Sequence, residues 1–443
     1  MVKPRQAEAT VKFIDEYCEF YRDLFPEVRS YEYLKYLHLG LISEQKRKTL
    51  PAIAQVSGKE NAQGLDYFFG KSPWSIEEYK KRRIKIILKV LEGEEITVII
   101  DETGDRKKGK KTDYVARQYI GNLGKVENGI VAVTAYGIIR EMTIPLLTQV
   151  YKPQSRLKEG DEYKSKPEIA VELLKELKEL GFKIKRVLAD SEYGESQSNF
   201  MRYLEQKELE FIVAIRSNHG MWLASDEEVK ANQWREFTRV FSTGKTETRF
   251  IREIIFGKRR EKRYWEITDD KDNLPPNSTV YVMTKIPNVN YQDIGNLYGL
   301  RNWIEYGLKQ SKNELGWADF RFMEYSKIEK WWELVMSAYL MVSLQSDKIY
   351  GIKTSSSDKV QSAQDKVEKH PRWNQGKGWK NTLNNLRLLI QPLCYANLLK
   401  PWLGVILNPS LLREFFSVFS QLNRFINSLI QTLFSRNFYL SLP

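Results

Sequence analysis

The pattern of apolar and polar positions divides the chain into helical ends and a strand-rich middle. Apolar residues recur at helical spacing in VKFIDEYCEFYRDLF, YEYLKYLHLGLIS and SIEEYKKRRIKIILKVL, so residues 1–93 are predicted to be helical. Between the second and third of these segments, Gly58 and Asn61 separate two short helical stretches. This arrangement is compatible with a DNA-binding helix-turn-helix and also with a plain helical packing unit.

Residues 94–216 show the pattern of a sheet with one crossover helix. ITVIID is predicted to be a buried strand, VARQYIGNLG and NGIVAVTAYGII a hairpin-like pair, and TIPLLTQVY a further antiparallel strand. KPEIAVELLKELKELGF is an amphipathic helix that stops at Gly181, and KRVLAD then returns as a strand. A crossover of this kind makes the two flanking strands parallel and brings Asp190 beside Asp101. FIVAIR is predicted to add one more strand.

The second half of the chain changes its pattern twice. Residues 217–288 contain four strand-like runs separated by turn residues, namely WREFTRVF, ETRFIREIIFG, KRYWEIT and TVYVMTK. Residues 289–350 return to helices, and residues 351–443 end in a long helix with apolar residues spaced alternately by three and four: Leu412, Phe415, Phe419, Leu422, Ile426, Leu429 and Leu433. This coiled-coil-like seam can serve packing on its own domain or contact with a second copy.

Composition narrows the partners. The chain has 443 residues, of which 42% are hydrophobic, so it can form a sizeable core and more than one domain. Its net charge of +13 favours a polyanionic partner, most simply nucleic acid. Cys18 and Cys394 are the only cysteines, which argues against a disulfide framework or a zinc site. Because we find no signal-peptide core and no run of about 18 apolar residues, we expect a cytoplasmic protein without membrane association.

Acidic and basic residues with a specific spacing provide the candidate chemistry. Asp101 and Asp190 each end an apolar run that is predicted to be a buried strand, and strand ends are where α/β folds place catalytic groups. In NLYGLRNWIEYGLKQSK, the offsets from Tyr298 to Arg301, Glu305 and Lys312 place all four side chains within an arc of about 60° on one helix. A carboxylate beside two cations and a phenol suits a phosphate held next to a metal ion.

These residues resemble the signature of the DDE transposases of bacterial insertion sequences. The spacing Tyr-x2-Arg-x3-Glu-x6-Lys is similar to that of the hairpin-forming group, and DETGDRKKGKKTDYVARQYIGNLGKVENGIVAV resembles the insertion-sequence-701-like branch. The resemblance covers residues 30–400 and implies an α/β fold: a ribonuclease-H-like catalytic core interrupted by a β-rich insertion, with helical N-terminal and C-terminal regions. It implies a DNA-binding domain at 1–93, core segments at 94–216 and 289–350, the insertion at 217–288 and a C-terminal helical region at 351–443.

The resemblance also assigns roles to the residues. Asp101, Asp190 and Glu305 would be the catalytic metal ligands for two Mg²⁺ ions, with Mn²⁺ as a substitute, because hard cations prefer carboxylate oxygens. Tyr298, Arg301 and Lys312 would hold the terminal phosphate of the transposon strand. A tryptophan of the insertion would support a base that leaves the stack during hairpin formation, and Trp265 is favoured over Trp222 and Trp234 because it follows a basic run.

A basic loop directly follows the first aspartate. Its side chains are expected to track a DNA backbone beside the metal site: Arg106, Lys107, Lys108, Lys110 and Lys111. The partners would be double-stranded DNA, as terminal inverted repeats and as target, and a second copy of the chain in a nucleoid-associated homodimer. Two alternatives stay open: a domesticated transposase that binds DNA without cutting it, and a stand-alone nuclease on the same core.

Overall fold

We describe residues 5–139, 142–220, 223, 225–241, 246–350, 366–405 and 408–433 from a computed structural model. They form two compact units, Met1–Ile86 with Lys309–Pro443, and Ile87–Leu308. The chain passes from one unit to the other within α5 (Ile76–Leu91) and again within α10 (Asn302–Asn313). The helical N-terminal and C-terminal regions, which the sequence analysis treated as separate segments, therefore belong to one unit.

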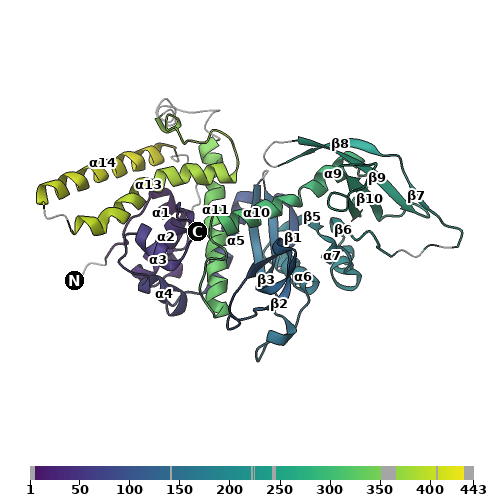
Figure 1. The fold of residues 1–443 in the computed structure, drawn as a ribbon, viewed down its shortest axis with the longest axis horizontal. Helices are drawn as coiled ribbons and strands as arrows, with labels where there is room; N and C mark the ends of the chain where they lie inside the picture. Colours follow the sequence, from purple (N-terminus) through teal and green to yellow (C-terminus); the bar gives the residue numbers. More distant parts are fainter. Residues whose placement is uncertain are drawn as a thin grey trace. The chain divides into compact units, whose positions relative to one another are not determined.

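The first unit is built around α11 (Tyr325–Tyr350), which packs on α2 (Val28–Ile42), α4 (Gln63–Gly70) and α13 (Trp379–Leu403) (Figure 1). The buried residues of α11 run along its whole middle, from Trp331 to Val342, as expected for a helix that is covered on all sides. Two further helices, α1 (Lys12–Glu19) and α14 (Pro409–Leu433), complete the unit.

The expected pair of short helices near the N-terminus is present. α3 (Leu50–Val56) is capped by Thr49, whose side chain accepts a hydrogen bond from Ala52 N, and α4 follows after a turn in which Gly58 has a φ of +69°. The apolar side of α4 is buried through Leu65 and Phe68. Because the sequence of α4, QGLDYFFG, contains neither lysine nor arginine, phosphate contacts at this place would have to come from the residues around it.

The second unit contains one mixed sheet of eleven strands within the described residues. The part that carries the aspartates has the order β4-β3-β1-β5-β6, formed by β1 (Glu95–Arg106), β3 (Lys125–Ile139), β4 (Met142–Val150), β5 (Lys183–Ala189) and β6 (Glu210–Ile215). β1, β5 and β6 are parallel, and β3 is antiparallel to both β1 and β4. This is the strand order of a ribonuclease-H-like core, as predicted; β2 (Ala116–Ile120) also pairs with β3.

The insertion continues the same sheet. β11 (Val280–Thr284) pairs antiparallel with β6, and β10 (Arg263–Thr268), β9 (Thr246–Phe256), β8 (Arg235–Val240) and β7 (Val229–Ala231) follow outward from it. β7 is a short strand that the sequence analysis did not predict. The crossover helix α6 (Lys166–Glu179) joins β4 to β5, while α7 (Ser191–Gly194) and α8 (Arg202–Gln206) lie between β5 and β6.

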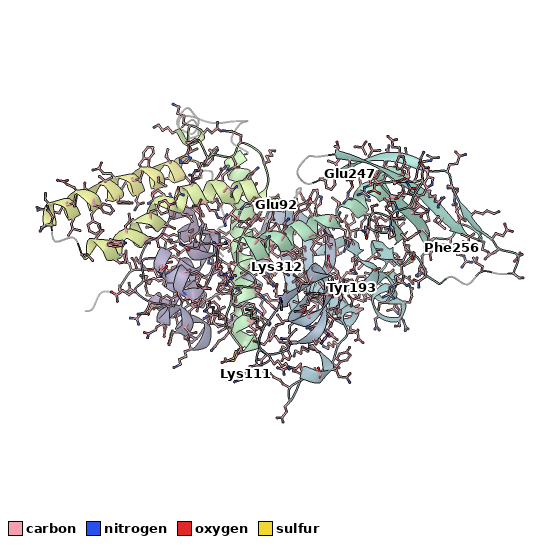
Figure 2. All side chains as sticks on the ribbon, viewed as in Figure 1. Glu92, Lys111, Tyr193, Glu247, Phe256 and Lys312 are labelled. Carbon is pink, nitrogen blue, oxygen red and sulfur yellow. The ribbon has the colours of Figure 1, made fainter. Side chains whose placement is uncertain are left out.

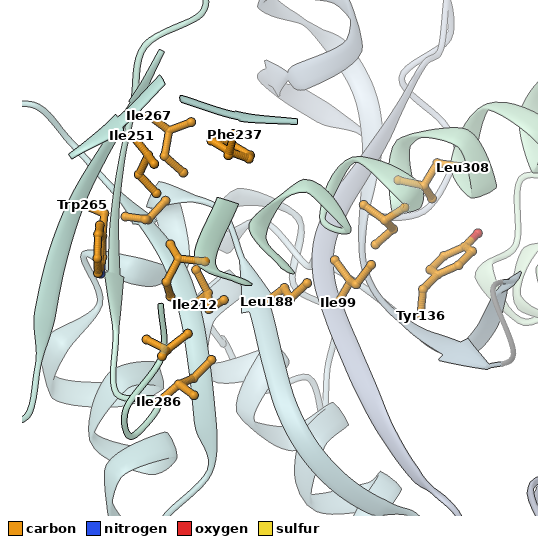
Figure 3. Packing of buried hydrophobic residues seen from close by; sticks show 14 residues of the cluster. Ile99, Tyr136, Leu188, Ile212, Phe237, Ile251, Trp265, Ile267, Ile286 and Leu308 are labelled. Atoms are coloured by element: carbon orange, nitrogen blue, oxygen red, sulfur yellow. The ribbon is translucent and has the colours of Figure 1, made fainter. Parts of the chain in front are cut away.

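One apolar cluster connects this sheet to the helices α9 (Tyr291–Gly299) and α10 (Figure 3). Ile99 of β1, Leu188 of β5 and Ile212 of β6 contribute from the core, and Ile251 and Trp265 contribute from the insertion. Ile294 and Ile304 contribute from the two helices. The face of the sheet that carries Ile99 and Leu188 is therefore the face on which α9 and α10 pack.

Two expectations need correction. β1 does not end at Asp101 but continues to Arg106, because it stays paired with β3 after its pairing with β5 has stopped at Ile100. The segment from Tyr298 to Lys312 is not one helix, since α9 ends at Gly299 and α10 begins at Asn302. No helix in the described part of the chain combines the length and apolar character needed to cross a lipid bilayer.

Candidate active site

The register of the parallel strands places Asp101 and Asp190 next to each other. Ile100 pairs with Ala189, so the following positions on the two strands are the two aspartates. Because side chains alternate along a strand, Asp101 points to the same face as Ile99, and Asp190 follows Leu188 in the same way. Both carboxylates therefore point toward the face that α9 and α10 cover.

Local hydrogen bonds fix both carboxylates. Asp101 Oδ1 accepts from Glu102 N at 2.8 Å, and Asp190 Oδ1 accepts from Glu192 N at 2.9 Å. The second bond makes Asp190 the N-cap of α7, so this aspartate also has the helix-capping role that such a residue plays in many folds. The Asp101 main chain is held in addition by Thr134 Oγ1, which donates to its carbonyl at 3.0 Å.

A tight joint between α9 and α10 brings Tyr298, Arg301 and Glu305 to the same place. Arg301 N donates to Tyr298 O at 3.0 Å and Ile304 N donates to Arg301 O at 3.1 Å, so the chain keeps turning with a shorter hydrogen-bond spacing. The helical character is retained closely enough that Arg301 and Glu305 still pair across four residues. The predicted alignment of these side chains is present although the helix itself is interrupted.

Arg301 bridges the first aspartate and the glutamate. Its Nη2 lies 3.5 Å from Asp101 Oδ2 and its Nη1 lies 3.3 Å from Glu305 Oε1. The guanidinium is mostly buried, and its Nε is a buried donor that has no hydrogen-bond partner among the described residues. Glu305 is 60% exposed, so one end of this bridge lies in the interior and the other end faces solvent.

The electrostatics indicate a shortage of positive charge at this edge of the sheet. Burial raises the pKa of Asp101 to about 6, Arg301 opposes the shift, and the charges of Asp190 and Glu305 increase it. Burial also raises the pKa of Tyr298, whose phenol is within electrostatic reach of Arg301 and of all three acids. The three predicted metal ligands and the phenol therefore share one electrostatic environment.

The donor set fits a divalent metal ion, but the side chains are not arranged to bind one as they stand. Carboxylate oxygens are the ligands that hard cations prefer, and the two aspartates are adjacent. Within the described residues, however, no three Asp, Glu, His or Cys side chains are close enough to hold one ion. Glu305 would have to turn from Arg301 toward the aspartates, and its exposure leaves room for that change of rotamer.

The basic residues at the end of β1 and in the loop after it are at or near the surface. Arg106 pairs with Glu127 at 2.9 Å, and Lys107 N donates to Asn128 O at 2.9 Å. Lys108, Lys110 and Lys111 are exposed in the loop that follows, where Figure 2 labels Lys111. Lys312, also labelled in Figure 2, is half-buried on α10, seven residues after Glu305. The DNA-contacting roles of these side chains stay predictions.

The preference for Trp265 conflicts with its burial. Trp265 is only 5% exposed, belongs to the apolar cluster, and has the Arg263 guanidinium 4.8 Å from its ring centroid. A ring in this position cannot stack on a base unless the insertion rearranges. Trp234 is half-buried with Arg252 over its ring at 4.3 Å, which suits a surface contact better. Trp222 lies outside the described residues.

Two contacts near the site were not predicted from the sequence. Lys166, at the start of α6, forms ion pairs with Glu102 and Glu192, the acids that lie one residue after Asp101 and two residues after Asp190. Arg239 of β8 is mostly buried and donates to Gly299 O at 3.4 Å, beside Tyr298. Neither has a local sequence signal, because each partner is at least 26 residues away along the chain.

Comparison with known proteins identifies the family of the chain. The family model for DDE superfamily endonucleases matches residues 21–239, and the model for the transposase DDE domain matches residues 157–341. The probable transposase for insertion sequence element IS701 of Microchaete diplosiphon is 59% identical over 329 residues, which cover 74% of this chain and 87% of that protein. The chain belongs to the DDE transposases of the IS701 type.

A solved structure, the piggyBac transposase synaptic complex with hairpin DNA, has 10% sequence identity and a TM-score of 0.41, covering 93% of this chain and 81% of that one. The family membership confirms the predicted resemblance and enzyme class. This transposase therefore binds DNA and catalyses DNA transposition, and its family uses divalent metal ions.

Proposed function

We propose that this transposase cuts DNA at the terminal inverted repeats of its own element and joins the freed 3′ ends to a target on the bacterial nucleoid. Asp101, Asp190 and Glu305 would hold two Mg²⁺ ions, with Mn²⁺ as a substitute. Bound there, the ions would supply the positive charge that activates the attacking water and stabilises the departing 3′-oxygen. The observation that carries the proposal is the adjacent aspartate pair, linked through Arg301 to Glu305.

The protein's own residues would position the DNA strand. Tyr298 and Arg301 lie beside the acids, and a guanidinium presents a planar pair of donors to phosphate. Arg301 would exchange its carboxylate contacts for the terminal phosphate, which frees Glu305 to turn toward the aspartates. Lys312 would add a point charge further along α10. The Tyr-x2-Arg-x3-Glu-x6-Lys spacing supports a route in which the first freed 3′-hydroxyl attacks the opposite strand to form a hairpin.

We also propose that two copies act together on paired DNA ends through α14. Three residues of the predicted seam, Leu412, Phe415 and Phe419, are half-buried in their own unit. A second row outside that seam, Leu411, Val418 and Phe425, is exposed and spaced seven residues apart. A charge-poor apolar stripe suits another protein surface rather than DNA. The helix would then have both roles that the sequence left open. Its half-buried row would pack on its own domain, and the adjacent exposed row would contact a second copy.

The test is an end-cleavage assay with cognate inverted-repeat DNA and Mg²⁺. Asp101→Ala and Glu305→Gln should each lower strand cleavage by about 10²–10³-fold or more, while end binding measured without metal stays near that of the wild type. The matched control is Glu172→Gln, which removes a carboxylate on α6 that pairs with Lys164. This variant should cleave normally.

Cleavage by Asp101→Ala at the wild-type rate would refute the assignment of the acids. Product analysis separates the alternatives, because a domesticated binding protein would not cut the ends, and a stand-alone nuclease would cut them without joining a 3′ end to a second DNA. Hairpin-capped flanking or transposon ends on a denaturing gel would show whether the hairpin route is used.

A further inference from the structure

The ammonium group of Lys166 contacts both chain segments that carry the catalytic aspartates. We call this cluster of Lys166, Glu102 and Glu192 the tie. Lys166 Nζ forms an ion pair with Glu102 Oε2 and lies 3.1 and 3.2 Å from the two oxygens of Glu192. Glu102 is the neighbour of Asp101 on β1, and Glu192 N donates to Asp190 Oδ1. Since side chains alternate along a strand, the tie lies on the side of β1 opposite to Asp101 and Arg301.

The lysine itself is held by a well-formed helix start. Ser165 and Glu168 form a capping box, in which Glu168 Oε2 accepts from Ser165 N at 2.8 Å and from Ser165 Oγ at 2.7 Å. Lys166 is the first residue of α6, and its ammonium also lies 6.0 Å from the centroid of the Tyr151 ring. The Lys166 side chain is 15% exposed, so this contact is not a loose surface ion pair.

Removing the ammonium would leave two carboxylates facing each other. Glu102 is even more buried than Lys166, and Glu192 is 38% exposed, so water could solvate only the second acid. Repulsion between them would push the start of α7 away from β1. Because Asp101 and Asp190 lie directly beside these glutamates, their separation would change with it.

We propose that Lys166 is a positioning residue of the metal site, which holds β1 and the start of α7 at the spacing that Asp101 and Asp190 need to share a metal ion. This inference rests on the proposed function, since it assumes that the two aspartates bind metal. Residues that orient metal ligands without touching the metal commonly change its affinity by 10–100-fold when replaced.

The sign of the change distinguishes positioning from a simple charge effect. Deleting a nearby positive charge makes the site more negative, so a purely electrostatic role predicts tighter cation binding in Lys166→Met. A positioning role predicts weaker binding in Lys166→Met and recovery in Lys166→Arg, which restores a cation that can bridge two carboxylates. A role in folding alone predicts a lower melting temperature with unchanged binding by the folded fraction.

The experiment measures Mn²⁺ binding by electron paramagnetic resonance on the full chain without DNA, alongside thermal unfolding. We expect about 10–100-fold weaker Mn²⁺ binding for Lys166→Met and within about threefold of wild type for Lys166→Arg. Lys164→Met is the matched control, because Lys164 also contacts two glutamates, Glu172 at 2.5 Å and Glu162 at 3.6 Å, but neither adjoins a catalytic aspartate. It should bind Mn²⁺ like the wild type.

If Lys166→Met does not fold, Glu192→Asp tests the same contact, since it keeps the charge and the buried Lys166–Glu102 pair and shortens only the side chain that links Lys166 to α7. It should also weaken Mn²⁺ binding. Unchanged or tighter Mn²⁺ binding in the folded variant would overturn the positioning role. Equal Mn²⁺ binding by wild type and Asp101→Asn would instead overturn the proposed function, so the two failures are distinguishable.

Discussion

At the scale of single residues, the site is characterised by acids that are incompletely neutralised. Arg301 is shared between Asp101 and Glu305, and Asp190 adds a further negative charge beside it. The raised pKa of Asp101 follows from this arrangement together with burial. A proton and a metal ion therefore compete for the same carboxylate, with a consequence for the pH range in which metal binds.

We predict that Mn²⁺ binding weakens below about pH 6. The carboxyl of Asp101 has a pKa of about 6, so it is ionised above that pH and protonated below it, whereas an ordinary aspartate would stay ionised to about pH 4. The apparent affinity should fall by up to about tenfold per pH unit below 6 and be level above it. Titrations of Mn²⁺ between pH 5 and 8 measure this directly.

Glu102→Gln is the control for this pH dependence. Burial raises the pKa of Glu102 to about 7, and its replacement removes that titration while leaving Asp101 in place. The inflection near pH 6 should persist in this variant. Affinity that stays constant down to pH 5 in the wild type would show that Asp101 is not a ligand or that its pKa is ordinary.

Sequence reasoning at this scale could select residues that the structure brings together only where the signal was local. Asp101 and Asp190 follow apolar runs, and Tyr298, Arg301 and Glu305 have a fixed spacing, so each could be selected from the chain alone. Lys166 could not be selected, because its role depends on contact with acids 64 and 26 residues away. Burial of Trp265 was equally invisible, since a basic run precedes both surface and core tryptophans.

At the scale of elements, the joint between α9 and α10 determines where Arg301 and Glu305 lie. α9 is held against β8 of the insertion, where Gly295 approaches the ring of Phe237 so closely that an added Cβ would lie 2.3 Å from ring carbon Cε2. Gly299 similarly leaves space for Arg239, with an added Cβ 3.1 Å from its Nε. The glycines of α9 thus permit the helix to pack on the insertion at short range.

We predict that Gly295→Ala destabilises the protein by about 1–3 kcal/mol, the usual cost of adding a methyl group to a filled core. The displaced α9 should also shift Arg301, so DNA cleavage should fall by more than the loss of folded protein explains. Urea unfolding together with the cleavage assay measures both effects.

The control for this prediction is Gly220→Ala, because the described residues place no atom within 4 Å of the Cβ that it would add. Its stability and cleavage should match the wild type. If Gly295→Ala were as stable as Gly220→Ala, the close approach of α9 to the insertion would not be part of the folded state.

The element predictions illustrate what periodicity can and cannot determine. The strands of the core and insertion were recognisable from their alternation and turn residues, but β7 has only three residues, too few to show a pattern. The predicted single helix through residues 298–312 was wrong because the turn at Leu300 and Arg301 keeps a helical sense, which the apolar spacing does not distinguish from an intact helix.

At the scale of the whole molecule, pairings between distant segments organise the chain. Ala214 of β6 pairs with Val282 of β11, which makes the insertion part of the core sheet rather than a separate domain. In the other unit, helices from both ends of the chain pack around α11. Neither arrangement can be predicted from local sequence patterns, because the periodicity of a strand or helix does not specify which distant segment it pairs with.

We predict that Val418→Asp prevents dimer formation. Val418 is 63% exposed in the middle of the apolar stripe of α14, and a carboxylate there would be buried without a partner if two stripes met. Sedimentation of Val418→Asp should show a monomer without DNA and one copy per DNA end when inverted-repeat DNA is present. Ser417→Asp, on a neighbouring exposed position outside the stripe, should behave like the wild type.

A dimer of Val418→Asp as stable as that of the wild type would exclude the α14 stripe as the interface. A wild-type chain that stays monomeric on paired DNA ends would exclude the homodimer itself.

The continuous sheet also determines the lateral distance between the strand that bears Asp101 and the strands of the insertion. From β1, which bears Asp101, five lateral steps through β5, β6, β11 and β10 lead to β9. At about 4.8 Å per step, this is about 24 Å, or roughly the length of seven base pairs of duplex DNA. Because every step is a hydrogen-bonded pairing, the insertion cannot swing as a hinged arm. Any grip it has on DNA is held at a constant offset from the point of cutting, and one strand more or fewer would change that offset by about one and a half base pairs.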